Sequence, residues 1–376
     1  MISSFSLSPS FRPVTIGIIG CGNIFTAYAK GCSLFRVLKL KACADLNLEA
    51  AKAKAEEFGI TAMSVAELLA DPEIEIVINL TIPKVHAVVS MDILRAGKHA
   101  YSEKPLAVTF EEGRALWDFA KEKGLRLGCA PDTFLGAGYQ TCRKIIDDGW
   151  IGRPLSGTAF MMSRGPEGWH PNPGFFYQKG AGPMMDMGPY YVTALIHLLG
   201  PVKSVFATTS AAASTRLATG KEHLGEVLPV EIPTHYAGNL LFHNGTLITM
   251  VMSFDVLATQ HKNIEIHGDQ ASLQAPDPNA FGGPVSIYRR STEAWEGVPL
   301  LFDYKENSRS IGVADMAHAI LANRPHRCDG SLALHALEVM TAFQRSHEKG
   351  GWRDLESTCK QPAPFPTGLP PQLLDS

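Results

Sequence analysis

The sequence lacks most of the features that mark extracellular, membrane or nucleic-acid-binding proteins. Its seven cysteines are scattered, odd in number and never spaced Cys-x-x-Cys, which argues against a disulfide framework and against a metal site. No apolar run approaches the roughly 18 residues that a membrane span needs. There is no long Lys/Arg run and the net charge is −3, so neither nucleic acid nor a membrane is an expected partner. Because residues 1–15 have no apolar core, we expect no signal peptide and a cytoplasmic location.

The length and the order of the sequence patterns predict two domains. A chain of 376 residues is longer than one hydrophobic core usually organises. With 45% hydrophobic and 19% charged residues, it has the balance of an ordinary globular protein. The pattern changes near Asp132, so we expect one domain over residues 1–132 and a second over 133–376.

The first domain alternates short apolar runs with amphipathic stretches, which predicts a Rossmann domain with a doubly wound parallel sheet. The expected strands are Thr15–Ile19, Leu38–Ala44, Ile74–Leu80, His99–Ser102 and Arg126–Cys129. The expected helices between them are Asn23–Phe35, Leu48–Phe58, Val65–Leu69, Lys84–Ala96 and Phe110–Lys123.

The second domain is expected to be α+β, with a large, mostly antiparallel open sheet. A helix at Ala137–Asp148 and another around Tyr190–Leu199 flank a Gly/Pro-rich loop at Gly165–Pro183. Strand patterns on both sides of Asn244-Gly245 indicate a hairpin, because Asn-Gly suits a turn with positive φ. The Pro-rich tail from Gln361 to Ser376 is expected to be irregular.

A glycine-rich turn after the first strand indicates a dinucleotide site. Gly20 permits the sharp turn, and Gly22 lets a pyrophosphate approach the N-terminus of the next helix, at Asn23 and Ile24. Asp45 closes the second strand, where a carboxylate accepts the ribose hydroxyls and repels a 2′-phosphate, so NAD is favoured over NADP.

Two residues near this site have a second interpretation or depart from the fingerprint. Asp45 could instead cap the helix at Leu48, a role that Asn47 could serve equally well. Phe25 occupies the position of the third small residue, which affects the packing of the helix against the strand more than the phosphate contacts.

Three further motifs resemble those of the Gfo/Idh/MocA family of sugar oxidoreductases, over nearly the whole chain. They are Asn-Leu-Thr-Ile-Pro-x-x-His at residues 79–86, a segment ending Glu-Lys-Pro-Leu at 103–106, and Gly-Ala-Gly-Pro-Met-Met-Asp-Met-Gly-Pro-Tyr at 180–190. The resemblance implies that Lys104 contacts both the nicotinamide and the reacting hydroxyl. It also implies a cofactor-binding role for Thr81, Pro83, His86 and Glu103. Without the motif, Lys104 would be interpreted as a surface lysine.

The chain departs from the family at the acid/base position. Most members end the third motif with a His and an Asp, where this chain has Tyr190 and Thr193. We expect Lys104 to lower the pKa of the Tyr190 phenol, which is ordinarily about 10. Asp186 would orient Lys104 or bind the sugar. The alternative is that Tyr190 only packs in the core, in which case His170 or Lys104 would handle the proton.

Substrate-binding candidates are fewer and less specific. Trp169 and His170 lie in the long loop before the third motif, where an indole face suits a sugar. Asp132 stands where many relatives carry an Arg that contacts the sugar, which makes it a candidate replacement. His235 either faces the site or is an ordinary strand residue, and we favour the latter.

These observations predict an NAD-dependent dehydrogenase acting on a ring hydroxyl of a sugar or glycoside, with C3 as a candidate position. One alternative is a glycosidase that uses NAD for transient oxidation and elimination, and another is a non-catalytic NAD-sensing regulator. We expect a homodimer or homotetramer formed through the open face of the sheet, as the family implies.

Overall fold

The computed structural model describes residues 12–369 and 373–374. The expectation about a signal peptide concerns residues 1–15, most of which lie outside this part, as does the end of the Pro-rich tail. Within the described ranges, no helix is long and apolar enough to cross a bilayer. No group of three or more His, Cys, Asp or Glu side chains in these ranges is placed to hold a metal ion.

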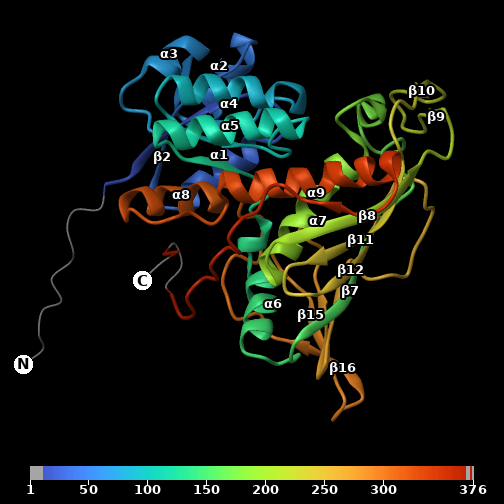
Figure 1. The fold of residues 1–376 in the computed structure, drawn as a ribbon. Helices are drawn as coiled ribbons and strands as arrows, with labels where there is room; N and C mark the ends of the chain where they lie inside the picture. Colours follow the sequence, from blue (N-terminus) through green and yellow to red (C-terminus); the bar gives the residue numbers. More distant parts are fainter. Residues whose placement is uncertain (1–11, 370–372, 375–376) are drawn as a thin grey trace, which may run out of the picture.

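The first domain, drawn in blue to blue-green in Figure 1, is built on a six-stranded sheet. The strand order is β3-β2-β1-β4-β5-β6, with parallel pairing throughout. Its strands are β1 (Val14–Ile19), β2 (Leu38–Ala44), β3 (Thr61–Met63), β4 (Ile76–Asn79), β5 (His99–Ser102) and β6 (Leu127–Cys129). Its helices are α1 (Phe25–Leu34), α2 (Leu48–Phe58), α3 (Val65–Ala70), the 3-10 turn η1 (Pro83–Val85), α4 (His86–Arg95) and α5 (Phe110–Lys123). The predicted Rossmann architecture is confirmed, with the short edge strand β3 added.

The register of this sheet brings three loops to one edge. Ile19, the last residue of β1, is paired with Asn79, the last of β4, and Asn79 is paired with Ser102, the last of β5. Because the strands are parallel, the turns that follow them lie side by side at the carboxyl edge, where such sheets bind ligands. The glycine-rich turn, Thr81 and Glu103 therefore share one edge.

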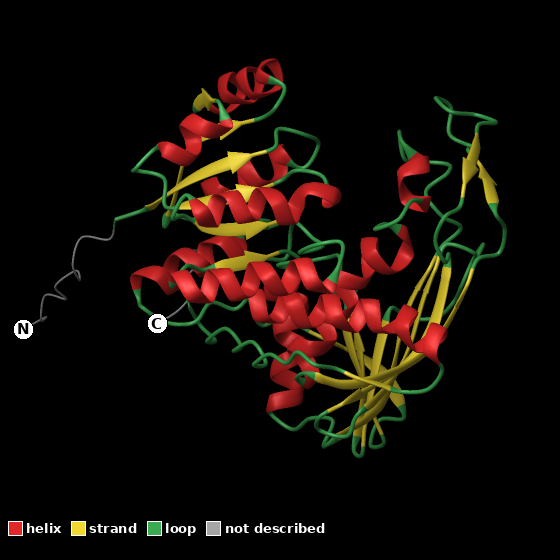
Figure 2. Cartoon of the chain, turned by 45° about the horizontal axis from the view of Figure 1, so that its top comes forward, coloured by secondary structure: helices red, strands yellow, loops and turns green. Residues whose placement is uncertain are grey.

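The second domain contains a nine-stranded sheet in the order β16-β15-β14-β13-β7-β12-β11-β8-β17. All neighbouring strands are antiparallel except β7 and β12, so the predicted open, mostly antiparallel sheet is confirmed. Its strands are β7 (Pro154–Met162), β8 (Val202–Ser210), β11 (His235–Phe242), β12 (Leu247–Ser253), β13 (Ile264–Gly268), β14 (Ala271–Ala275), β15 (Val285–Arg289), β16 (Ala294–Val298) and β17 (Arg353–Asp354). Figure 2 shows the helices gathered on one side of this sheet.

The second domain also contains helices and a small hairpin. They are η2 (Thr133–Leu135), α6 (Ala137–Asp147), η3 (Pro173–Tyr177), α7 (Gly182–Leu199), the hairpin β9 (Thr215–Leu217) with β10 (Val227–Pro229), α8 (Ile311–Leu321) and α9 (Gly330–Lys349). The sequence patterns did not predict α8 or α9. Helix α8 returns to the first domain and packs against α1 and β6, while α9 packs against β8, α7 and α5. The chain after residue 310 therefore bridges the two sheets.

Helix α7 begins at Gly182, eight residues before its expected start at Tyr190. The Gly-rich motif, which was expected to lie mostly in the preceding loop, forms its first two turns. Pro183 lies in the first turn, where a helix requires no N–H donor, although Pro189 lies in the interior. The earlier start places Asp186 and Tyr190 four residues apart in one helix, and therefore on the same face.

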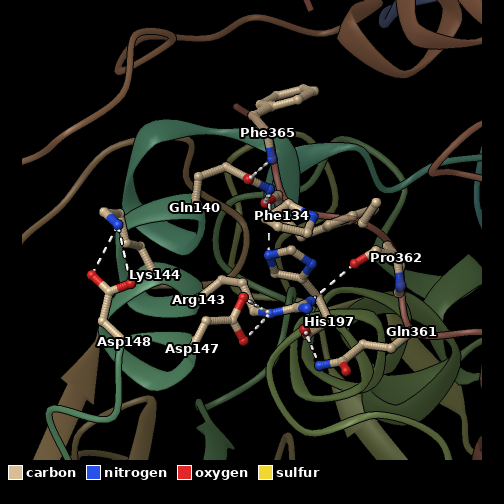
Figure 3. Close-up of polar contacts among 12 residues, drawn as sticks. Phe134, Gln140, Arg143, Lys144, Asp147, Asp148, His197, Gln361, Pro362 and Phe365 are labelled. Carbon is tan, nitrogen blue, oxygen red and sulfur yellow. Dashed lines mark hydrogen bonds and ion pairs between the residues drawn. The ribbon is translucent and has the colours of Figure 1, made fainter. Parts of the chain in front are cut away.

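The described part of the Pro-rich tail is irregular and is bound to α6 and α7 (Figure 3). The Arg143 guanidinium donates to the carbonyls of His197 and Pro362, at 2.8 and 2.9 Å. Gln140 accepts from the backbone N–H of Phe365 at 2.8 Å. These contacts satisfy buried backbone groups of the tail, so the segment packs closely without forming a strand or helix.

Candidate active site

The glycine-rich turn has the geometry that a pyrophosphate requires. Gly20 has φ +103°, and a Cβ there would lie 2.7 Å from the carbonyl of Leu80, so only glycine fits. A Cβ added at Gly22 would meet nothing within 4 Å, which leaves the backbone open to a ligand. Helix α1 has no side-chain N-cap and no acidic residue in its first turn. Its first N–H groups, from Asn23 and Ile24 onward, suit an anion.

Asp45 binds the glycine-rich turn and does not cap a helix. Its Oδ2 accepts from the backbone N–H of Cys21 at 2.7 Å, and its Oδ1 accepts from that of Asn47 at 2.8 Å. Asn47 is the N-cap of α2, since its side chain accepts from Glu49 N. The capping interpretation of Asp45 is therefore wrong. The next side chain, Leu46, is fully exposed and supplies no cation for a 2′-phosphate.

Phe25 is accommodated by packing between the first two helices. Its ring is completely buried and meets Phe58 of α2 edge-on, with the centroids 5.7 Å apart. The large side chain at the third fingerprint position therefore fills the space between α1 and α2 and leaves the turn at Gly22 open.

His86 connects the turns after β4 and β5. It is buried, with Nδ1 2.8 Å from the carbonyl of Pro105 and Nε2 2.9 Å from that of Thr81. Thr81 is fixed further by Asn79, whose Oδ1 accepts from both the N–H and the hydroxyl of Thr81. Both ring nitrogens of His86 are thus occupied by the protein, and it holds the loops that present Thr81 and Pro83 to the cavity.

Lys104 and Asp186 form an ion pair across the two domains. Lys104 Nζ donates to the Asp186 carboxylate at 2.8 Å and to the Asp186 backbone carbonyl at 2.7 Å. Burial would lower the pKa of Lys104, but the charge of Asp186, with smaller contributions from Tyr190 and Glu103, raises it overall. Lys104 is therefore a cation at neutral pH.

Glu103 orients the backbone that carries Lys104. One carboxylate oxygen accepts from the Tyr28 hydroxyl of α1 at 2.8 Å, and the other accepts from the backbone N–H of Lys104 at 2.8 Å. Glu103 therefore fixes the loop after β5 against α1, at the margin of the cavity.

Tyr190 lies beside this pair, but the charge of Lys104 is not enough to bring the pKa of the Tyr190 phenol below its ordinary value. Its side chain is almost completely buried, and Lys104 Nζ lies over the face of the ring, 5.2 Å from the centroid. Burial raises the pKa of the phenol, and the nearby cations Lys104 and Arg309 offset only part of that effect. Lys104 lowers the pKa of Tyr190 as predicted, but burial raises it by more, so the net shift is upward.

These residues surround a cavity of about 400 Å³ between the two domains. Its lining includes Ile24, Thr81, Pro83, His86, Glu103, Lys104, His170, Phe175, Phe176, Asp186, Tyr190 and Arg309. Arg309, from the turn before α8, had no motif or spacing in the sequence to reveal it. It reaches the cavity only because α8 returns to the first domain.

Three candidates lie outside this lining. The Trp169 side chain is 69% exposed and makes edge contact with His170 at 5.4 Å between centroids, so His170 alone of that pair faces the cavity. Asp132 is buried and accepts from Gly312 N at 3.1 Å at the start of α8, so the expectation that it binds the sugar is not met. His235 pairs with Ser253 Oγ at 2.9 Å within the sheet.

Comparison with known sequences identifies the family. Residues 14–130 match the family described as an oxidoreductase family with an NAD-binding Rossmann fold, and residues 139–274 match the GFO/IDH/MocA C-terminal domain. The chain belongs to the Gfo/Idh/MocA family. The predicted resemblance is confirmed, and so is NAD as the cofactor of the first domain.

Individual Gfo/Idh/MocA proteins are similar to the chain over most of its length. It is 27% identical to a 1,5-anhydro-D-fructose reductase from Ensifer adhaerens, over 76% of this chain and 82% of that protein. It is 29% identical to a D-glucoside 3-dehydrogenase from Escherichia coli, over 69% of this chain and 76% of that protein. A levoglucosan dehydrogenase solved in complex with NADH has the same fold, with a TM-score of 0.78 and 22% identity over 92% of this chain and all of that chain.

Proposed function

We propose that the protein is an NAD-dependent dehydrogenase that acts on a ring hydroxyl of a sugar or glycoside. The observation that carries this proposal is the meeting of Lys104, Asp186 and Tyr190 in one cavity at the NAD-binding edge. A cavity of about 400 Å³ suits a small polar substrate beside a nicotinamide. Hydride transfer from a carbinol requires a proton acceptor beside the cofactor, and these side chains provide one.

The first domain offers a contact for each part of NAD. The open backbone at Gly20, Gly22, Asn23 and Ile24 suits the pyrophosphate, and Asp45 suits the adenosine ribose. Thr81, Pro83, Glu103 and Lys104 line the cavity where the nicotinamide would lie, with His86 supporting them. When bound, NAD supplies the carbon that accepts or donates the hydride.

Tyr190 and Lys104 have different roles toward the substrate hydroxyl. Lys104, held by Asp186, is a fixed cation that donates a hydrogen bond to the substrate oxygen and stabilises negative charge on it. Tyr190 Oη exchanges the proton with that oxygen. In the reducing direction the Tyr190 phenol donates this proton, and in the oxidising direction the ionised form of Tyr190 accepts it. Because burial raises the pKa of Tyr190, oxidation should become faster as the pH rises. His170 is proposed as a further sugar contact from the opposite loop.

The substrate class rests on the relatives as well as on the cavity. Relatives that are similar over long stretches include proteins named as a sugar reductase, a glucoside 3-dehydrogenase and a levoglucosan dehydrogenase. The second of these names supports C3 of a pyranoside as the position of oxidation.

A spectrophotometric panel tests the proposal. Purified protein with NAD is offered levoglucosan, alkyl glucosides, free aldoses and inositols, and NADH formation is followed at its absorbance band. We expect turnover with at least one cyclic polyol and none with the Lys104→Ala variant. Release of an aglycone from glycosides without accumulation of NADH would indicate bond cleavage by transient oxidation, and no response to any member would contradict the proposed function.

We also propose that the protein is a homodimer or homotetramer through the open face of the nine-stranded sheet. Exposed apolar side chains on or beside its strands include Phe206, Leu247, Tyr288, Trp295 and Trp352. The two aromatic pairs among them, Phe206 with Trp352 and Tyr288 with Trp295, lie towards opposite edges of the sheet, and we propose that they are buried between subunits. A monomeric mass at micromolar concentration by light scattering would contradict this proposal.

A further inference from the structure

A cluster of charged side chains around Arg216, on β9, lies outside the lining of the cavity. The Arg216 guanidinium donates to the carboxylates of Glu167 and Asp255, with Nη1 2.7 Å from Asp255 Oδ1. Its Nη2 also donates to the backbone carbonyls of Arg164 and Phe254, at 2.9 and 3.0 Å. All three charged side chains are mostly buried. One arginine therefore joins the small hairpin, the loop before α7 and the residues that follow β12.

The 164–177 loop forms one side of the cavity, although most of its residues belong to no helix or strand. His170 and Phe176 of this loop line the cavity. Besides the Arg216 contacts, the carbonyl of Glu167 accepts from the N–H groups of residues 219 and 220, at 3.0 and 2.8 Å. A loop with few backbone hydrogen bonds of its own depends on such contacts for its shape. The hairpin and the Arg216 cluster therefore determine where this side of the cavity lies.

A continuous series of contacts leads from Arg216 to His170. Phe254, whose carbonyl accepts from Arg216, packs its ring edge-on against Phe176, with the centroids 6.4 Å apart. Phe176 in turn meets the His170 ring edge-on, at 4.7 Å between centroids. The Arg216 guanidinium also lies over the ring of Tyr177, 5.7 Å from its centroid. Displacement of the guanidinium would therefore be transmitted to the side chains that line the cavity.

The conformation of the loop also decides which nitrogen of His170 can donate to a ligand. His170 Nδ1 accepts from the backbone N–H of Asn172 at 3.0 Å. In a neutral imidazole one nitrogen carries the proton when the other accepts, so the proton lies on Nε2. An N–H donor of fixed tautomer suits the oxygen of a sugar hydroxyl.

We propose that Arg216 is a positioning residue for sugar binding, which holds the 164–177 loop through Glu167 and Asp255 and so presents His170 to the substrate. The contribution to sugar binding rests on the proposed function, whereas the holding of the loop does not. Because Arg216 does not line the cavity, its effect falls on sugar affinity and not on hydride or proton transfer. A guanidinium suits the task because its donors, fixed in one plane, reach two carboxylates and two carbonyls at once, which an ammonium cannot do.

Hydrogen exchange of the full chain, without cofactor or sugar, tests whether Arg216 holds the loop. Peptides covering the 164–177 loop are compared in wild type, in Arg216→Gln, which removes the charge, and in Arg216→Lys, which keeps the charge but loses the planar donors. Arg289→Gln is the matched control. Arg289 also pairs with a carboxylate, Glu296, and lies over an aromatic ring, Trp150. It belongs to β15, next to β16, which Figure 1 shows at the opposite end of the second domain from β9.

Exchange of the loop should become about tenfold faster or more in Arg216→Gln, because two buried carboxylates lose their partner. Arg216→Lys should give a smaller acceleration, and Arg289→Gln should give none. Unchanged exchange of the loop in a folded Arg216→Gln variant would overturn the proposal.

Steady-state kinetics with a sugar from the panel tests the effect on binding. Arg216→Gln should raise KM by roughly three- to tenfold, the value of one hydrogen bond, while kcat and the dissociation constant for NADH stay near those of wild type. In a His170→Ala background the same substitution should change KM little, since the two residues act through one contact. An equal rise in KM in both backgrounds, or a loss confined to kcat, would contradict the proposed role. If no sugar is oxidised but exchange of the loop accelerates, the proposed function fails and the holding of the loop by Arg216 stands.

Discussion

The cavity has two walls that are built in different ways. The NAD wall consists of the turns that follow β1, β4 and β5, and the substrate wall consists of the side chains of Lys104, His170, Asp186, Tyr190 and Arg309. On the NAD side, most contacts involve backbone groups or residues near one another in the chain, such as Asn79 with Thr81 and Asp45 with Asn47, although the Tyr28 hydroxyl reaches Glu103 from 75 positions away. On the substrate side they are made by side chains far apart in sequence. Lys104 and Asp186, for example, are 82 positions apart.

This difference indicates where the protein tolerates change. A wall of backbone N–H groups keeps its shape when a single side chain is altered, because the turn and the helix N-terminus remain. A wall of paired charges does not, because removal of one partner leaves the other buried without compensation. Substitutions on the two sides of the cavity should therefore differ in their consequences.

Lys104→Ala should have the largest effect. It removes the cation that we propose binds the substrate oxygen, and it leaves the Asp186 carboxylate without its partner. Turnover should fall by at least the 10²–10⁴-fold that is typical of a lost acid/base group, while the dissociation constant for NADH, measured by fluorescence, should change little. Lys84→Ala, at an exposed site on the same edge, is the control. A large loss of NADH affinity would show that the two walls are not separable.

Tyr190→Phe should reduce turnover by about 10²–10⁴-fold without affecting the fold, because the ring remains and only the hydroxyl is lost. Combined with Lys104→Ala, it should add little, since groups that act as a unit are non-additive. The neighbouring Tyr191→Phe is a close control, because the Tyr191 hydroxyl bonds to Phe160 and Asn263 away from the cavity. Equal turnover in wild type and Tyr190→Phe would leave the phenol a packing role only.

Asp132→Asn should stabilise the protein. Burial raises the pKa of Asp132 from 3.8 to about 6, although Gly312 and Arg309 oppose the change. The pKa of Asp132 is higher in the folded state than in the unfolded state. The contribution of Asp132 to the free energy of unfolding is therefore most favourable below pH 4 and is lost as the pH rises through 6. At pH 7 the variant should be more stable by about 2–3 kcal/mol in urea unfolding, and the gain should disappear near pH 4.

The same variant also distinguishes the two roles considered for Asp132. If the carboxylate is only buried beneath the cavity, KM for the sugar should be unchanged in Asp132→Asn. A large increase in KM would indicate that Asp132 binds the sugar after all. Asp303→Asn, at an exposed position, should alter neither quantity.

Asp45→Ala should have the smallest of these effects. It removes the ribose contact and the hydrogen bond to Cys21, but leaves the pyrophosphate turn intact. We expect wild type to bind NAD at least about tenfold more tightly than NADP and the variant to lose that preference, because a carboxylate repels the 2′-phosphate. Adding Leu46→Arg should favour NADP further. Calorimetric titration of both cofactors, with exposed Glu56→Ala as control, measures this.

Most of the NAD wall could be predicted from the sequence alone, because its residues lie at the ends of strands that the sequence pattern reveals. Strand periodicity placed β1, β2, β4 and β5 within one or two residues, and parallel strands must bring their carboxyl ends to one edge. The positions of Gly20, Gly22 and Asp45 followed from the strand pattern, and the family resemblance added Thr81 and Glu103. Family resemblance added the roles of Lys104, Asp186 and Tyr190.

The arrangement of the substrate wall could be known only from the folded structure. The early start of α7 put Asp186 and Tyr190 on one face, although its glycines and prolines are typical of a loop. Helix α8 brought Arg309 to the cavity that Tyr190 also lines, from more than a hundred positions along the chain, where no spacing rule applies. Burial, which is a property of the whole fold, raises the pKa of Tyr190 when the sequence had suggested a lowered value. The fold also buries Asp132 outside the cavity. Desolvation and long-range contacts are not encoded in any short segment, so the sequence could name the reacting groups but not their environment.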